Sequence, residues 1–494
     1  MTGNKIYLLL IYISIILLGY IFILSVFVKS PSMLNIPSFL VLTAVGLLCT
    51  AMFWGVRFYH RIKISNRNFL IILVLATIMP RLIWILLVNS QPDSDFILFN
   101  EYAVNASKGV FTVFNPTYTV FPFKFGFPLV ISVIYKIFGS NLIDAKLFSV
   151  LISVCTALQI YSISRRIFND HVGRITGLLY SLWPAQIMLT SVLASEHIFL
   201  LFLLLSIQLF LKTIDHTGIR KNMAYPIVTG ISLAITQFIR PVALILVPIF
   251  IVYLFLFKPS QECKIKSILF KCKTTVTVGV IFVLSFLILT LPLSGLIGVP
   301  IYKSSSGFNL LIGTNFASNG AYNKEDSKII TEFIYDYAKI HKEAMTRAIN
   351  RILANPLSFT MLMERKYITQ WGSEDYGVYW SMRKTGYSNA VGQFLINSPR
   401  LLNAASQIYY IFVLLLSIIG CLYCIKNRHY QIIIFLLLFQ GLFIAHTFLE
   451  VQSRYHFPAM PAFIIMAGYG YYCAVSFREE IRRPAKKKLH FGSI

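Results

Sequence analysis

The chain has 494 residues, of which 57% are hydrophobic and only 13% are charged, and its mean hydropathy is +0.71. About a quarter of the residues in soluble domains are charged, so this composition excludes an ordinary soluble globule. The net charge of +25 does not indicate a nucleic-acid-binding protein, because the basic residues stand in short clusters between long apolar runs. That distribution is typical of the cytoplasmic loops of a membrane protein.

Apolar runs of about 18 to 25 residues recur along the sequence, and each is long enough to cross a hydrocarbon core about 30 Å thick as a helix. Strands are not expected, because a lone strand in lipid leaves its backbone polar groups unpaired. We therefore predict an all-α polytopic membrane protein with about twelve transmembrane helices. The predicted spans are 6–28, 37–57, 69–88, 142–165, 172–190, 196–212, 225–240, 241–257, 275–293, 404–425, 430–449 and 457–477.

The basic clusters predict which side of the membrane each loop faces. The pair Arg165 and Arg166, the pair Lys426 and Arg428, and the tail at 482–488 are expected in the cytoplasm, together with both termini. The apolar segment 127–138 is only about 12 residues long, so we interpret it as an interfacial helix that does not cross. If it crossed, every later basic cluster would face outward.

This topology divides the chain into five regions and places the long loops outside the plasma membrane. An additional transmembrane hairpin (1–60) precedes a transmembrane core (61–293), whose first outer loop is 89–126; an extracytoplasmic loop (294–403), C-terminal transmembrane helices (404–477) and a basic cytoplasmic tail (478–494) follow. The loop at 294–403 is expected to fold as a small cap with helices between Lys328 and Tyr367. Most of the 19 Asp and Glu residues then lie on the outer side.

The first outer loop contains two candidate catalytic carboxylates, Asp93 and Asp95, in the segment Gln91-Pro-Asp-Ser-Asp-Phe96. Such a segment also forms ordinary solvated turns. The residues after it predict an amphipathic juxtamembrane helix over 96–109, with Phe99, Tyr102, Ala103 and Ala106 on its apolar face. An aspartate held at the membrane surface in this way is suited to act as a general base.

Four further ionisable residues stand near the predicted outer boundary. Glu196 opens an otherwise apolar span, where it either caps the helix or faces a wet cavity. Lys124, Arg240 and Arg454 lie on the outer side against the positive-inside trend, either as snorkelling side chains or as ligands of a lipid-linked phosphate. A divalent-metal site built from Glu196 and the residues His197, His446 and His456 is a weaker alternative.

Several short motifs occur in a characteristic order along the chain. They are Lys124-Phe-Gly-Phe-Pro128, Lys136-Ile-Phe-Gly139, Ser164-Arg-Arg-Ile-Phe168, Trp183-Pro184, Ala194-Ser-Glu196, Arg240-Pro241, Asn309-Leu-Leu-Ile-Gly313, Asn355-Pro356 and Arg454-Tyr-His-Phe-Pro458. In this order and spacing, from about residue 80 onward, the chain resembles the protein O-mannosyltransferase and aminoarabinose transferase superfamily of GT-C glycosyltransferases, similar to glycosyltransferase family 39.

The resemblance implies transfer of a sugar from a polyprenyl-phosphate carrier to an extracytoplasmic acceptor, with inversion and without a required cofactor. It implies that Asp95, or Asp93 as the alternative, takes the proton of the acceptor. Lys124, Arg240 and Arg454 would bind the lipid phosphate, with Glu196 and Tyr455 as active-site support. The hairpin before residue 60 and the serine between the two aspartates depart from the usual family pattern.

Two other functions fit the same topology. An O-antigen polymerase or ligase also has about twelve spans and one long outer loop, and it would rely on arginines of that loop, such as Arg347, Arg351 and Arg365. A lipid-oligosaccharide flippase or transporter would show internal repeats with broken helices near mid-depth, and the sequence shows none. The sugar and the acceptor are not identified by the sequence.

Overall fold

The computed structural model describes residues 2–27, 37–61, 64–113, 115, 117–215, 223–258, 264–303, 306–333, 335–386 and 389–482. Within these ranges the regular structure is helical, apart from one isolated bridge between Ser90 and Thr385. This confirms the predicted all-α class. Most of the predicted basic tail lies outside the described residues.

Eight helical stretches are long and apolar enough to cross a membrane, which agrees with the predicted multi-pass class. They are built on α1 (Thr2–Phe27), α3 (Asn66–Leu87), α7 (Leu142–Ile167), α10 (Glu196–Asp215), α13 (Lys264–Ile297), α21 (Pro399–Lys426), η3 (Tyr430–Ile432) with α22 (Ile433–Phe448), and η4 (Ser453–Ala459) with α23 (Met460–Arg482). The other four predicted spans fall on helices whose apolar stretches are shorter than 18 residues. These are α2 (Ser38–Arg61), α8 (Asp170–Ser181), α11 (Ala224–Ile239) and, after the turn η2 (Pro241–Ile245), α12 (Leu246–Leu256).

The predicted span at 172–190 is not one continuous helix, because the helix breaks within it. α8 ends at Ser181, and the short helix α9 (Pro184–Leu189) starts after Trp183. Proline lacks an amide N–H and disfavours helical geometry at the residue before it, so Pro184 starts a new helix instead of continuing α8. A further non-helical stretch, 190–195, then leads to Glu196 as the first residue of α10.

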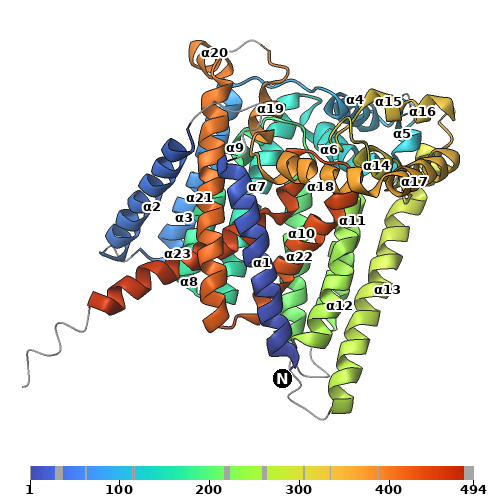
Figure 1. Cartoon of the computed structure of the whole chain (residues 1–494). Coiled ribbons are helices and arrows are strands. Elements are labelled where there is room, and N and C mark those ends of the chain that lie inside the picture. The colour runs from blue at the N-terminus through green and yellow to red at the C-terminus, as the bar shows by residue number, and fades with distance from the viewer. Residues whose placement is uncertain are drawn as a thin grey trace, which may run out of the picture.

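The loops after α3 and α13 fold into short helices at one end of the bundle, opposite the end where the N-terminus lies (Figure 1). The first loop forms α4 (Asp95–Ser107), α5 (Thr117–Val120), η1 (Pro122–Phe125) and α6 (Gly126–Phe138). The second forms α14 (Ser306–Gly313), α15 (Lys324–Ser327), α16 (Ile329–Glu332), α17 (Tyr337–Ala354), α18 (Pro356–Trp371), α19 (Tyr376–Met382) and α20 (Ala390–Ile396). We call α14 to α18 the cap.

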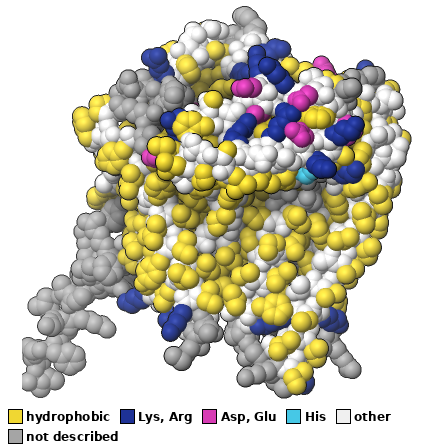
Figure 2. Space-filling view, turned by 45° about the vertical axis from the view of Figure 1, so that its right-hand side comes forward, with side chains coloured by type: hydrophobic (Ala, Val, Ile, Leu, Met, Phe, Trp, Pro, Cys, Tyr) yellow, Lys and Arg dark blue, Asp and Glu magenta, His cyan; other side chains and the backbone are white. Residues whose placement is uncertain are grey.

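The predicted amphipathic helix of the first loop is confirmed. α4 buries Phe96, Phe99, Tyr102, Ala103 and Ala106, which include the four residues expected on its apolar face. α6 has 13 residues and packs against α4. Figure 2 shows acidic side chains gathered near the end of the molecule that carries these loops, whereas Lys and Arg side chains are visible at both ends.

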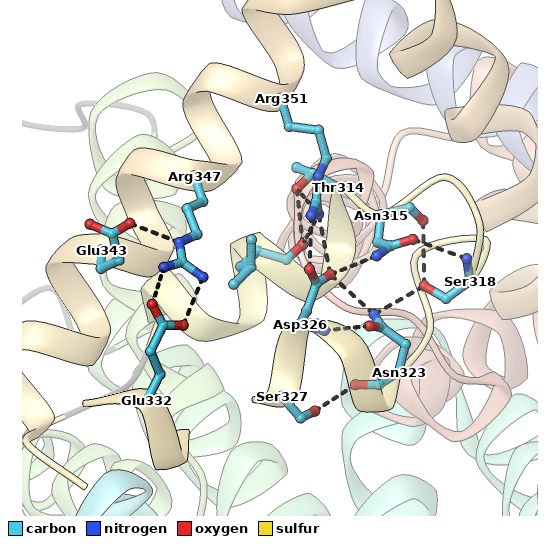
Figure 3. A network of polar contacts seen from close by, with 11 residues as sticks. Thr314, Asn315, Ser318, Asn323, Asp326, Ser327, Glu332, Glu343, Arg347 and Arg351 are labelled. Carbon is cyan, nitrogen blue, oxygen red and sulfur yellow. Dashed lines mark hydrogen bonds and ion pairs between the residues drawn. The ribbon is translucent and has the colours of Figure 1, made fainter. Parts of the chain in front are cut away.

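A hydrogen-bonded network around Asp326 holds the cap together (Figure 3). Its carboxylate accepts hydrogen bonds from Arg351 of α17 at 2.8 and 3.2 Å and from the side chains of Asn315 and Asn323. A second pair, Arg347 with Glu332, lies nearby at 2.7 Å but is exposed on both sides. The two ion pairs therefore allow the contribution of a buried carboxylate to cap stability to be compared with that of an exposed one.

We expect Asp326→Asn to destabilise the cap by about 1.5–3 kcal/mol, the range for hydrogen bonds to charged groups, and Glu332→Gln to have little effect. Amide hydrogen exchange of α14 to α16 would measure the stability of the cap in both variants.

Burial raises the pKa of Asp326, but Arg351, Asn315 and Asn323 lower it more, so the net shift is downward. The stabilisation is therefore complete above the ordinary Asp pKa of about 3.9 and is lost as the pH falls through the depressed value. Equal exchange rates in the two variants would contradict the assignment.

Candidate active site

A cavity of about 1180 Å³ opens between the first outer loop, the cap and the ends of α10, α11 and α22. Its walls mix aromatic and aliphatic side chains with a few charged groups, as is usual for a site that binds a small molecule. Of the residues proposed for catalysis, phosphate binding and active-site support, the cavity is lined by Asp95, Lys124, Glu196, Arg240, Arg454 and Tyr455. The fold thus brings together residues that lie up to 360 positions apart.

Asp95 and Lys124 form an ion pair inside this cavity, with Nζ of Lys124 3.0 Å from Oδ1 of Asp95. Burial raises the pKa of Asp95, but Lys124 and, less strongly, Arg454 and Arg240 lower it more, so its carboxyl group is held ionised. Lys124 also lies 4.6 Å from the centre of the Phe121 ring. The pair is partly open to the cavity, since the side chains are 35% and 17% exposed.

A close helix contact places Lys124 beside Arg240. Gly126, at the start of α6, lies against the backbone of Phe238 and Ile239, and a Cβ atom there would fall 1.8 Å from the Phe238 carbonyl oxygen. Only glycine permits this approach of η1 and α6 to the end of α11. The Lys124-Phe-Gly-Phe motif and the Arg240-Pro241 turn are therefore neighbours in space.

Asp93 has a different partner from Asp95. Its carboxylate pairs with Arg383, which also lies 5.3 Å from the ring centres of both Tyr379 and Trp380. Asp93 is not among the residues that line the cavity. The backbone of Ser94, between the two aspartates, has φ 54° and ψ −131°, a strained conformation for a residue with a side chain, and the next residue, Asp95, lines the cavity.

Glu196 connects two of the three cations. Its Oε1 atom is 2.5 Å from Nη1 of Arg240 and 4.0 Å from Nε of Arg454, and its side chain is only 3% exposed. As the first residue of α10, it also lies at the positive end of a helix dipole. A buried carboxylate with two guanidinium partners fixes both arginines at the wall of the cavity.

Arg454 is further held by aromatic rings. Its guanidinium lies 4.5 Å from the ring centre of Trp380, 5.3 Å from that of Phe96 and 5.6 Å from that of Tyr455. Stacking on aromatic faces leaves the edge of a guanidinium available for an anion. Arg454 therefore combines a fixed position with free hydrogen-bonding capacity.

Glu450 is a cavity residue that the sequence analysis did not identify. Its Oε1 atom accepts hydrogen bonds from Gln452 Nε2 at 3.2 Å and from Tyr455 Oη at 3.4 Å. Burial raises its pKa more than Arg454 and Lys124 lower it. Its backbone N–H donates to the Asn309 carbonyl at 2.9 Å, because Gly313 allows α14 to pack directly on the end of α22.

The histidines considered for a metal site are not brought together. His456 is buried and pairs with Glu374 at 2.8 Å, whereas the Nδ1 atom of His446 lies 3.2 Å from the Glu450 carbonyl oxygen. Among the described residues, no three His, Cys, Asp or Glu side chains are grouped closely enough to hold a metal ion. The cap arginines Arg347, Arg351 and Arg365 bond to other cap residues, and none lines the cavity.

Residues 124–289 match the family model described as dolichyl-phosphate-mannose-protein mannosyltransferase. The matched segment contains Lys124, Glu196 and Arg240. No curated protein matches the sequence. The family match supports the resemblance to GT-C glycosyltransferases that the motifs indicate.

One solved structure shows a similar fold. The chain is similar to the oligosaccharyltransferase of Archaeoglobus fulgidus in its apo form, with 14% identity and a TM-score of 0.50 over 87% of this chain and 53% of that chain. It therefore spans about half the length of that protein. ArnT from Cupriavidus metallidurans, solved with undecaprenyl phosphate, matches with 10% identity and a TM-score of 0.37 over 84% of this chain and 80% of that chain.

Proposed function

We propose that this protein is a membrane glycosyltransferase that moves a sugar from a polyprenyl-phosphate carrier to an extracytoplasmic acceptor, with inversion at the anomeric carbon. The observation that carries the proposal is the arrangement of Asp95, Lys124, Glu196, Arg240 and Arg454 around one cavity. The family match over residues 124–289 supports it, because the donor named in that family is a sugar on a lipid phosphate.

In this proposal the three cations receive the carrier phosphate. Arg240 and Arg454 are already fixed by Glu196, so little side-chain entropy is lost when a phosphate binds. Their guanidinium groups form charge-assisted hydrogen bonds to phosphate oxygens, and they stabilise the charge that develops as the sugar leaves. The proposal invokes no cofactor, because side-chain cations are available for this task.

Asp95 is the proposed general base, and its ion pair with Lys124 explains how it becomes active. Lys124 holds the pKa of Asp95 low, which makes the carboxylate a weak base. A bound phosphate competes for Lys124, which weakens the pair and strengthens Asp95 as a base. Proton removal from the acceptor is thereby linked to the presence of the donor.

We further propose that the protein crosses the plasma membrane about twelve times, with both termini in the cytoplasm and the cavity outside. The distribution of basic clusters supports this orientation, and the four shorter helices would complete the crossings. The acceptor is then a cell-envelope glycan, lipid or protein, and the partners are membrane lipid and the lipid-linked donor. No nucleic acid is involved.

The test is to supply the purified protein, in sealed vesicles with the cap facing outward, with a panel of polyprenyl-phosphate sugars carrying hexoses or pentoses. We expect one member of the panel to be consumed when a cell-envelope acceptor is also supplied, with the sugar bonded to the acceptor outside the vesicles. Consumption of none, or transfer to an acceptor enclosed in the lumen, would contradict the proposed donor or the proposed orientation.

A further inference from the structure

The cavity contains one carboxyl group that the reaction as described does not use. Glu450 lines it beside Arg454 and Tyr455, and only its Oε1 atom has hydrogen-bond partners. Within the described part of the chain, no donor or acceptor bonds to its Oε2 atom. A carboxyl oxygen that has no partner, on a residue that lines a binding cavity, is available to a ligand.

The charges around the cavity favour a neutral Glu450. Lys124, Arg240 and Arg454 carry three positive charges, and Asp95 and Glu196 carry two negative ones, which leaves one positive charge. The remaining charged lining residues do not change this balance, because Lys324 and Asp375 carry opposite charges and Arg383 is paired with Asp93. A sugar linked to a lipid by a phosphodiester carries one negative charge and matches this balance only while Glu450 is protonated.

The charge is redistributed when the sugar leaves. The carrier is then a phosphate monoester, which gains a second negative charge unless it takes up a proton, since its second pKa is about 6. The proton that the acceptor gives up goes to Asp95, whereas the new negative charge develops on the phosphate oxygen that the sugar leaves. A proton delivered to the phosphate as the bond breaks neutralises this charge where it develops.

We propose that Glu450 is a general acid of this site: in its protonated form it hydrogen-bonds the carrier phosphate through Oε2 and transfers its proton to it as the sugar leaves. This inference rests on the proposed function. The bond between the anomeric carbon and the phosphate oxygen breaks with its electron pair going to that oxygen, and the acceptor oxygen forms the new bond. The acceptor proton goes to Asp95 and the Glu450 proton goes to the phosphate, after which exchange with water resets both carboxyl groups.

The surroundings of Glu450 support this role. The titratable or charged groups that face it are Asp95 from α4, Lys124 from η1, His446 from α22, and Arg454 and Tyr455 from η4. Burial keeps its pKa above the ordinary value despite the two cations. Asp95, with its pKa lowered by Lys124, shows the opposite shift. Two carboxyl groups with opposite shifts in one cavity are the usual arrangement of an acid and a base.

The test is Glu450→Gln, which keeps the shape, neutrality and hydrogen-bonding ability of the protonated side chain but has no proton to transfer. We expect kcat to fall by about 10²-fold or more with the KM for the polyprenyl-phosphate sugar unchanged. Glu364→Gln, at an exposed glutamate of α18, is the matched control and should retain the wild-type kcat. Wild-type kcat in Glu450→Gln would overturn the inference.

The pH profile separates an acid from a structural residue. The wild-type kcat should decline at alkaline pH as Glu450 loses its proton, and Glu450→Gln should be slow but lack this decline. If Lys124 caused the decline, the variant would retain it, and the inference would fail. Tyr455→Phe removes a hydrogen bond to Oε1 that stabilises the ionised form, so the decline should move to higher pH.

Failure of the inference is distinguishable from failure of the proposed function. If the wild-type protein consumes no polyprenyl-phosphate sugar, the function itself is wrong. If the wild-type protein consumes one and its kcat shows no alkaline decline, only the role of Glu450 is wrong, and this second measurement does not require a variant to fold.

Discussion

Asp95→Asn should lower kcat by about 10²- to 10⁴-fold, the range that general acid–base catalysis contributes, while the protein stays folded and inserted in the membrane. The carboxylate is the acceptor of the proton in the proposed reaction, and an amide of the same shape cannot take it. Donor consumption by purified protein measures the effect. A melting temperature close to that of the wild type shows that the loss is chemical.

Asp93→Asn is the matched comparison, because it removes the same charge two residues away. Asp93 pairs with Arg383 and does not line the cavity, so we expect a loss of less than about tenfold. Arg383 keeps its contacts with Tyr379 and Trp380 in this variant. The reverse result, with Asp93→Asn inactive and Asp95→Asn active, would move the base to Asp93.

The parts of the candidate site that depend on local sequence patterns could be predicted from the sequence. The apolar face of α4 follows from helical periodicity, and it was predicted correctly from Phe99, Tyr102, Ala103 and Ala106. Four charged residues could be identified because ionisable groups near apolar spans are costly and usually have a functional role. They are Lys124, Glu196, Arg240 and Arg454. The structure places all four at one cavity.

Other parts depend on contacts between distant segments. In the sequence, Glu450 resembles an ordinary polar residue between two spans. It becomes buried only because Gly313, 137 positions earlier, packs against it. Likewise, two aspartates separated by one serine are equivalent in sequence. The positive φ of Ser94 and the partner Arg383, nearly 300 residues later, distinguish them.

The helix break at Trp183-Pro184 is marked in the sequence by the proline, but the apolar composition of the segment predicted one continuous span. The segment 172–190 is apolar enough to suggest one span, yet the proline ends the helix. The break has a consequence for the site, since the non-helical residues after α9 place Glu196 at the start of α10, level with the cavity.

Glu196→Gln should destabilise the protein by about 3–5 kcal/mol, the range for breaking a buried ion pair by removing one partner. Arg240 and Arg454 would then face each other without their shared carboxylate. Asp215→Asn, at the other end of α10, is the matched control, because it removes an equivalent charge from an ion pair with Arg166 in which Asp215 is 45% exposed. Thermal unfolding in detergent should show a clear loss for Glu196→Gln and little change for Asp215→Asn.

The same variant tests whether the two arginines bind phosphate. Without Glu196, a lipid phosphate is the remaining anion that can neutralise them, so polyprenyl phosphate should raise the melting temperature of Glu196→Gln more than that of the wild type. A neutral polyprenol of the same length should not do so, because it lacks the charge. Equal stabilisation by the alcohol and the phosphate would show that the lipid tail, and not the arginine pair, is responsible, and the assignment of Arg240 and Arg454 would be wrong.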